Sequence, residues 1–187
     1  AISKWQEAGL TLNLALNVSV ASLSDLSLPD RLRDRLRQSN LAPDQVIVEI
    51  TESLLLKEDT QSMEVLCRLS LMGFKVSIDD FGTGYSSMSK LTRFPFSELK
   101  IDQRFVRHSS YDHISATILK TSAMLGRELD MTVVAEGVER LEDWDAVRRA
   151  GVDIVQGFLV AKPMPEKEFG EWVRNWQREM EVSTSGA

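Results

Sequence analysis

Carboxylate and amide side chains recur along this chain within or just after short apolar runs. They are Asn17, Glu49, Asp79, Asp80, Glu136 and Gln156, and Lys100 lies in another such run. Oxygen atoms of carboxylates and amides are the ligands that Mg²⁺ and Mn²⁺ favour. An ionised Glu49 inside an apolar strand is costly to bury unless it is paired or bound to a metal. The set therefore indicates a site for hard divalent cations.

Each of these residues also has an ordinary structural interpretation. Asn17 could cap the turn that follows it, and Glu49 could pair with a buried Arg or Lys. Asp79 and Asp80 could form a turn with Asx hydrogen bonds. Lys100 could be a surface lysine, and Glu136 and Gln156 could simply end their strands. Recurrence across five strands favours one shared site over these separate explanations.

Other chemistries lack the residues that they need. The two histidines, His108 and His113, lie in a polar stretch, and no His or Cys cluster has the spacing of a zinc site. The 187 residues carry a net charge of −6, which disfavours DNA or long RNA as a partner. A small phosphate ligand stays compatible with this charge, because bound cations reverse the local electrostatics.

The elements that must position these residues alternate between strands and helices, as in repeated βα units around a parallel sheet. The six predicted strands are Thr11–Val20, Gln45–Thr51, Lys75–Asp79, Glu98–Ile101, Thr132–Ala135 and Asp153–Phe158. The predicted helices are Leu28–Ser39, Thr60–Met72, Ser86–Thr92, His113–Leu129, Leu141–Ala150 and Glu166–Met180. Strand side chains alternate, so Glu49 should lie opposite Val46, Val48 and Ile50, which should face the helices. The acidic residues then fall at carboxyl ends of strands, where parallel α/β proteins bind ligands.

Two α/β architectures fit six βα units: an open doubly wound sheet, or an incomplete (β/α)8 barrel lacking two strands, since a complete barrel needs about 250 residues. We expect one domain over residues 1–182 and a flexible tail over 183–187. The first residues read as the end of a helix, so the chain is expected to begin mid-element. No apolar run is long enough to span a membrane, and we expect a cytoplasmic domain whose parent protein could be membrane-tethered.

Six motifs, in order along nearly the whole chain, carry a specific resemblance. They are Leu16-Asn17-Val18-Ser19, Glu49-Ile50-Thr51-Glu52, Asp79-Asp80-Phe81-Gly82-Thr83-Gly84-Tyr85-Ser86-Ser87, Leu99-Lys100-Ile101-Asp102, Ala135-Glu136-Gly137-Val138-Glu139 and Gln156-Gly157-Phe158. In these motifs the sequence resembles EAL-domain cyclic-di-GMP phosphodiesterases, which are (β/α)8 barrels of the TIM type. The resemblance implies metal-dependent hydrolysis of cyclic-di-GMP to linear pGpG, with two Mg²⁺ or Mn²⁺ ions.

The resemblance also implies a role for each matching residue. The metal ligands would be Asn17, Glu49, Asp79, Asp80 and Glu136, with Asp79 shared by both ions; the catalytic residues would be Lys100, Glu136, Asp80 and Gln156. Lys100 would orient or activate the attacking water. Glu52 would anchor the loop from Phe81 to Ser87, and Gly137, Glu139 and Phe158 would contact substrate.

One departure from the family concerns the Glu-Ala-Leu segment that gives it its name, whose glutamate is also a metal ligand. This segment is absent here, and Glu7-Ala8-Gly9 does not replace it. An N-terminal truncation would explain the missing segment and the missing strands together, so we expect weak or no activity from this polypeptide alone. A receptor that binds cyclic-di-GMP without hydrolysis is the alternative. The family implies a homodimer formed through about His108 to Leu129, and an upstream sensory or receiver domain.

Overall fold

The computed structural model describes residues 5, 9–10, 12–53, 60–84 and 91–185. The chain separates into two compact units, one of residues 13–160 and the other of residues 1–12 and 161–187. Most of the helix predicted over Ser86–Thr92 lies outside the described residues. The last three residues of the motif that begins at Asp79, Tyr85-Ser86-Ser87, also lie outside them. Every other predicted site residue lies in the larger unit.

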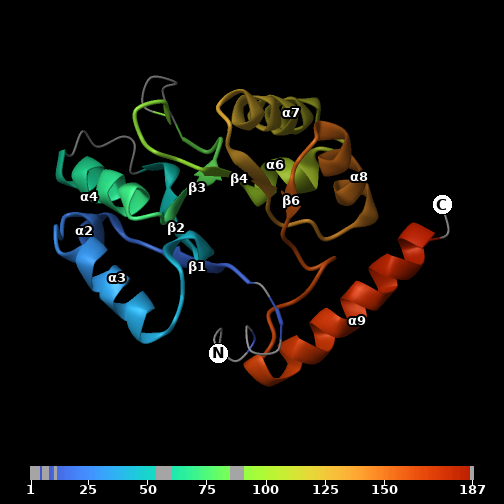
Figure 1. Ribbon diagram of the computed structural model, residues 1–187. Helices are drawn as coiled ribbons and strands as arrows, with labels where there is room; N and C mark the ends of the chain where they lie inside the picture. Colours follow the sequence, from blue (N-terminus) through green and yellow to red (C-terminus); the bar gives the residue numbers. More distant parts are fainter. Residues whose placement is uncertain (1–4, 6–8, 11, 54–59, 85–90, 186–187) are drawn as a thin grey trace. The chain divides into compact units, whose positions relative to one another are not determined.

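The larger unit is built on one sheet of six parallel strands (Figure 1). The strands are β1 (Leu14–Asn17), β2 (Val46–Thr51), β3 (Lys75–Phe81), β4 (Glu98–Ile101), β5 (Thr132–Ala135) and β6 (Ile154–Val155). They neighbour each other in sequence order, whereas a doubly wound sheet reverses its order at a switch point. The described part is therefore an incomplete barrel wall.

Helices follow the strands and cover one side of this sheet, as right-handed crossovers in a consistent direction require. They are α2 (Val20–Leu23), α3 (Leu28–Gln38), the 3₁₀ turn η1 (Pro43–Gln45), α4 (Thr60–Leu71), α6 (Gln103–His108), α7 (His113–Glu128) and α8 (Leu141–Ala150). In Figure 1, α4 and α7 lie on the outer side of the sheet. Val46, Val48 and Ile50 are buried in the core, as their alternation predicted.

The opposite face of the sheet is polar although much of it is buried. Glu49, Ser77, Glu98 and Lys100 are each less than a tenth exposed, on three neighbouring strands. Burial of this many polar groups is costly unless they pair with one another or with a bound ion. The inner face of the sheet is therefore where a site must be sought.

Two strands are shorter than predicted, for identifiable reasons. β1 ends at Asn17 because Ser19 caps α2, its Oγ accepting a hydrogen bond from the backbone N–H of Ser22 at 3.2 Å. β6 ends at Val155, and the backbone then pairs with the segment after β5: Val138 N–H donates to the Gln156 carbonyl at 3.1 Å. The prediction of strand structure over Asp153–Phe158 was therefore too long.

Two helical segments also differ from prediction. α6 was not predicted, and it begins because Asp102 caps it by accepting from the Arg104 backbone N–H at 2.8 Å. In the smaller unit, α9 (Glu166–Ser185) extends beyond the predicted Met180 into the segment expected to be a tail. Within that unit, Trp5, Phe169, Trp172 and Trp176 form a row of ring contacts with centroids 4.7–5.9 Å apart.

Candidate metal and phosphodiester site

Lys100 lies at the centre of a group of carboxylates contributed by separate strands. Its Nζ lies 2.7 Å from Glu136 Oε1, 2.9 Å from Glu49 Oε1 and 3.3 Å from Asp79 Oδ1. Lys100 is only 4% exposed, so it is not a surface lysine. Glu49 does pair with a buried lysine, one of its ordinary interpretations, but that lysine also holds two other carboxylates.

The electrostatics of this group reflect burial working against pairing. Burial disfavours the ammonium ion, but hydrogen bonds to Glu136 and Glu49 outweigh it, and the pKa of Lys100 is raised. Burial raises the pKa of Glu136, and its hydrogen bond with Lys100 opposes this only in part. Lys100 is therefore a cation. Its single positive charge offsets only part of the negative charge of the three carboxylates that it contacts.

Asp79 and Asp80 follow each other on β3, where alternation would turn their side chains to opposite faces. The pairing of β3 with β4 is irregular between Ile78 and Phe81, and Asp80 has a left-handed φ of 57°. The Asp80 backbone N–H donates to Asp79 Oδ1 at 3.0 Å. This bulge re-aims a side chain, as bulges near active sites often do.

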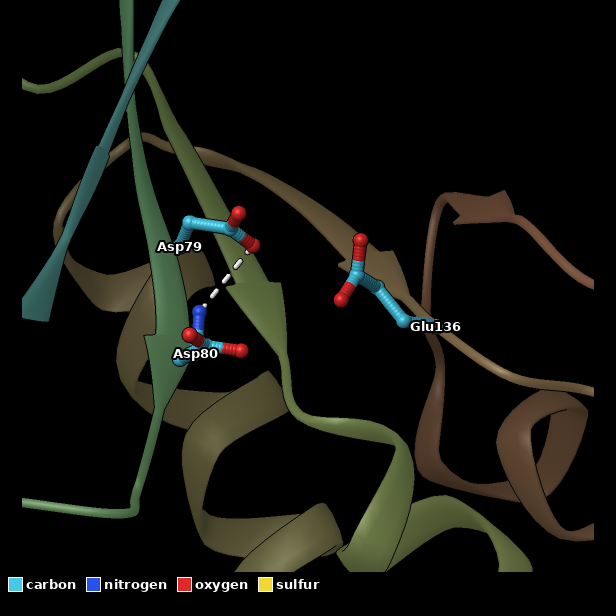
Figure 2. A group of neighbouring side chains, drawn as sticks. All are labelled: Asp79, Asp80 and Glu136. Atoms are coloured by element: carbon cyan, nitrogen blue, oxygen red, sulfur yellow. Dashed lines mark hydrogen bonds between the residues drawn. The ribbon is translucent and has the colours of Figure 1, made fainter. Parts of the chain in front are cut away.

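The bulge lets three carboxylates from two elements converge. One oxygen each from Asp79, Asp80 and Glu136 lie within 4.8 Å of one another. Figure 2 shows Asp79 and Asp80 on one strand, with Glu136 directed toward them from the end of β5. The three are partly buried, and their oxygens are the donor type that hard cations take. This donor set fits Mg²⁺ or Mn²⁺.

The other predicted ligands lie around this cluster at different depths. Glu49 contacts Lys100 directly, whereas Asn17 is its neighbour in register on β1 and is exposed. Gln156 follows β6 and is exposed, and its backbone N–H donates to the Ala135 carbonyl at 2.9 Å, next to Glu136. Of the predicted ligands, Asp79, Asp80 and Glu136 converge in this cluster, whereas the side chains of Asn17 and Gln156 are exposed.

Glu52 is buried and binds the start of the loop that follows Asp80. Its Oε2 accepts hydrogen bonds from the backbone N–H groups of Gly82, Thr83 and Gly84 at 3.0, 3.1 and 2.9 Å. A Cβ at Gly84 would lie 3.1 Å from the carboxylate carbon of Glu52, so a larger residue there would press against this carboxylate. One carboxylate thus fixes the backbone immediately after the bulge.

Asp102 supports Asp80 from the neighbouring strand end. Asp102 is buried, and its Oδ1 also accepts from Arg104 Nε at 2.9 Å. Burial is the largest cause of the raised pKa of Asp80, followed by the charges of Asp79 and Asp102. The sequence placed Asp102 in a family motif but assigned it no role, because only its contacts reveal one.

A cavity of about 240 Å³ opens beside Glu136, between α6 and the segments after β5 and β6. Its lining residues are Gln103, Arg107, Glu136, Gly137, Glu139, Gln156, Gly157 and Phe158. The three residues predicted to contact substrate, Gly137, Glu139 and Phe158, are among them. Gln103 and Arg107 were not predicted, because α6 itself was not.

An acidic cluster around a buried lysine, at the carboxyl ends of parallel strands and next to a cavity, defines an α/β protein of barrel type with a candidate metal site. The EAL domain family model matches residues 1–163. The chain belongs to the EAL domain family.

Three relatives place this chain within the family. The cyclic di-GMP phosphodiesterase PdeR of Escherichia coli (strain K12) is 36% identical over 175 residues, a match that covers 94% of this chain and 26% of that protein. A solved structure described as the PaMucR phosphodiesterase in complex with c-di-GMP superposes with a TM-score of 0.85 at 39% identity, covering 90% of this chain and 68% of that one. A manganese and cyclic-di-GMP complex of Klebsiella pneumoniae BlrP1 gives a TM-score of 0.79 at 36% identity, covering 86% and 41%. The chain thus spans about a quarter of PdeR.

Proposed function

We propose that this chain is the greater part of a phosphodiesterase domain that hydrolyses cyclic-di-GMP to linear pGpG with two divalent cations, Mg²⁺ or Mn²⁺. The observation that carries the proposal is the convergence of Asp79, Asp80 and Glu136 within 4.8 Å, beside Lys100. Relatives named for this activity, and solved complexes with the dinucleotide and manganese, support it.

In this proposal, Asn17, Glu49 and Asp79 hold one cation, and Asp79 and Asp80 hold the second, with Glu136 completing the network. Bound cations of this kind polarise phosphoryl oxygens and lower the pKa of a bound water toward neutrality. Lys100 orients or activates the attacking water, and it offers a positive charge to the phosphate. Gln156 assists at the rim, and Gly137, Glu139 and Phe158 line the substrate side.

The wider setting is also proposed. Residues 1–182 would form the domain described here, and a longer protein would supply a sensory or receiver domain upstream, because PdeR is much longer than the matched region. Tyr111, Ile114 and Met124 are 53–70% exposed in the segment from His108 to Leu129, which supports a homodimer through that surface. A cytoplasmic location is proposed for the domain. Among the described residues, no helix combines the length and apolar character needed to cross a membrane.

The test is turnover of cyclic-di-GMP by the full-length protein with Mg²⁺ or Mn²⁺, with pGpG measured by chromatography. Asp79→Asn and Lys100→Met should each lower kcat by about a hundredfold or more, as loss of a group acting on the reacting atoms does. Asp145→Asn, at an exposed position on α8, is the matched control and should retain activity. Tight binding of cyclic-di-GMP without any pGpG would instead establish a receptor.

A further inference from the structure

Arg107 is a charged residue of the cavity beside Glu136 to which the proposed reaction assigns no role. It lies on α6, and its Nη2 donates to Glu139 Oε1 at 2.7 Å. The Arg107 side chain is 41% exposed and the Glu139 side chain 35% exposed, although the Nε of Arg107 is buried without a hydrogen-bond partner among the described residues. The exposed part of the Arg107 side chain is therefore its terminal nitrogens or its methylene groups, not the Nε. Arg107 is also one of the residues that line the cavity.

The backbone around Arg107 holds this pair in place. Gly137 has a left-handed φ of 69°, and a side chain there would overlap Gln103 and lie 3.3 Å from Arg107 Nε. The carbonyl of Arg107 accepts from Arg140 Nη2 at 3.0 Å. The Arg107 side chain is therefore packed against the segment that carries Glu136 and Glu139.

The other half of the pair is fixed by a fully buried carboxylate. Asp143 Oδ2 accepts from the backbone N–H groups of Glu139 at 3.3 Å and Arg140 at 3.1 Å. Arg140 Nη2 also pairs with Asp143 Oδ1 at 3.1 Å. An ion pair preorganised in this way loses little conformational entropy when a ligand binds.

We propose that Arg107, together with Glu139, selects guanine in the substrate, an inference that rests on the proposed function. Guanine presents its O6 acceptor next to its N1–H donor, so a guanidinium beside a carboxylate matches that edge. Adenine presents the reverse, an amino donor next to an acceptor nitrogen. The Arg107 donors would then face another donor, and the Glu139 carboxylate would face another acceptor. Arginine is the common partner of guanine O6 and N7, and Phe158, 54% exposed in the same cavity, offers an aromatic face for stacking.

The test compares Arg107→Ala and Arg107→Lys with the unchanged full-length protein, using cyclic-di-GMP and cyclic-di-AMP. Dissociation constants are measured by calorimetry, and turnover is measured on both dinucleotides and on bis(p-nitrophenyl) phosphate, which has no base. Arg107→Ala should weaken binding of cyclic-di-GMP by about 10- to 100-fold, with the loss appearing in KM rather than kcat. The preference for guanine over adenine should fall by a similar factor. Lysine should restore little, because it lacks the planar donor pair.

Turnover of bis(p-nitrophenyl) phosphate should stay within about twofold of the unchanged protein. Arg148→Ala, at an exposed position on α8, is the matched control and should leave every value unchanged. A double-mutant cycle with Glu139→Ala should show strong non-additivity, because the two residues act as one unit. Melting temperatures of all variants separate a folding defect from a binding defect.

Three outcomes would overturn the role of Arg107: unchanged affinity for cyclic-di-GMP in Arg107→Ala, equal losses on all three substrates, or an unchanged base preference. Failure of the proposed function looks different. If the unchanged protein binds cyclic-di-GMP without hydrolysing it, the enzyme proposal fails while the dissociation constants still decide the role of Arg107. If the unchanged protein binds no cyclic-di-GMP, both proposals are wrong.

Discussion

At the scale of single residues, the site is governed by the balance of charge around Lys100. One buried ammonium ion contacts Glu49, Asp79 and Glu136, and Asp80 lies close to two of those three. Four carboxylates around one lysine leave an excess of negative charge in a partly buried space, which favours the binding of cations. Burial is the largest cause of the raised pKa of both Glu136 and Asp80, and the charge of the neighbouring Asp79 adds to it.

Glu52 gives a residue-scale prediction about the loop after Asp80. Glu52→Ala should destabilise the fold by about 2 kcal/mol, because three backbone N–H groups lose their common acceptor. It should also lower turnover, since the loop begins directly after Asp80. Chemical denaturation and steady-state kinetics measure the two effects.

Two variants control this prediction. Glu52→Gln keeps an acceptor oxygen of the same reach and should lose less stability than Glu52→Ala. Glu64→Ala, at an exposed position on α4, should change neither stability nor turnover. Equal effects of Glu52→Ala and Glu64→Ala would show that Glu52 does not anchor the loop.

At the scale of elements, strand and helix ends decide where the chemistry lies. The bulge in β3 brings Asp79 and Asp80 into one cluster, and the cap of α6 by Asp102 places Gln103 and Arg107 beside the cavity. The bulge lies where the predicted strand Lys75–Asp79 was expected to end, and α6 was not predicted at all. The residues of the candidate site thus lie where a strand is interrupted or where a helix begins.

The N-cap of α7 gives an element-scale prediction with a definite pH dependence. Hydrogen bonds from Ser115 lower the pKa of Asp112, helped by the backbone of Ile114 and the charge of His108. A carboxyl whose pKa is lower in the folded state stabilises the fold above its unfolded pKa of about 4, and this contribution is lost as the pH falls through the folded pKa. Asp112→Ala should lower the Tm by a few degrees at pH 7.

The difference in Tm between the unchanged protein and Asp112→Ala should shrink as the pH falls below about 4. Asp112→Asn is the control, because asparagine caps helices well but does not titrate there. At pH 7 its Tm should lie between those of the unchanged protein and Asp112→Ala, because asparagine keeps the cap but not the charge. A difference that is constant from pH 7 to pH 3 would mean that the charge of Asp112 contributes nothing.

At the scale of the whole molecule, cation binding and folding are expected to be coupled. A ligand at 100 times its dissociation constant stabilises the folded state by about 2.7 kcal/mol, which is about 5 to 10 °C in Tm for a domain of this size. Saturating Mn²⁺ should therefore raise the Tm of the full-length protein, and a chelator should reverse the shift.

The carboxylate cluster should be responsible for this coupling. Asp79→Asn should remove most of the Mn²⁺-dependent shift, whereas Asp145→Asn, at an exposed position on α8 outside the cluster, should retain it. Differential scanning calorimetry with and without Mn²⁺ measures both. An equal shift in the two variants would place the cation elsewhere.

The sequence alone determined the parallel βα order and the family, and it predicted the residues of the candidate metal site. These follow from local patterns: apolar alternation in β2 buries Val46 and Val48, and motifs such as Leu99-Lys100-Ile101-Asp102 need no knowledge of neighbours. The βα pattern left both an incomplete barrel and a doubly wound sheet open, and the family resemblance implied the barrel. The sequential strand order in the structure confirms it.

Only the tertiary structure decided how the site residues meet. The contacts of Lys100 with three carboxylates, the bulge at Asp80 and the pair of Arg107 with Glu139 join residues that are far apart in sequence or break the regular strand pattern. Such contacts depend on the register of neighbouring strands and on helix ends set by single caps. Local propensity does not encode that information, because it is fixed by long-range packing.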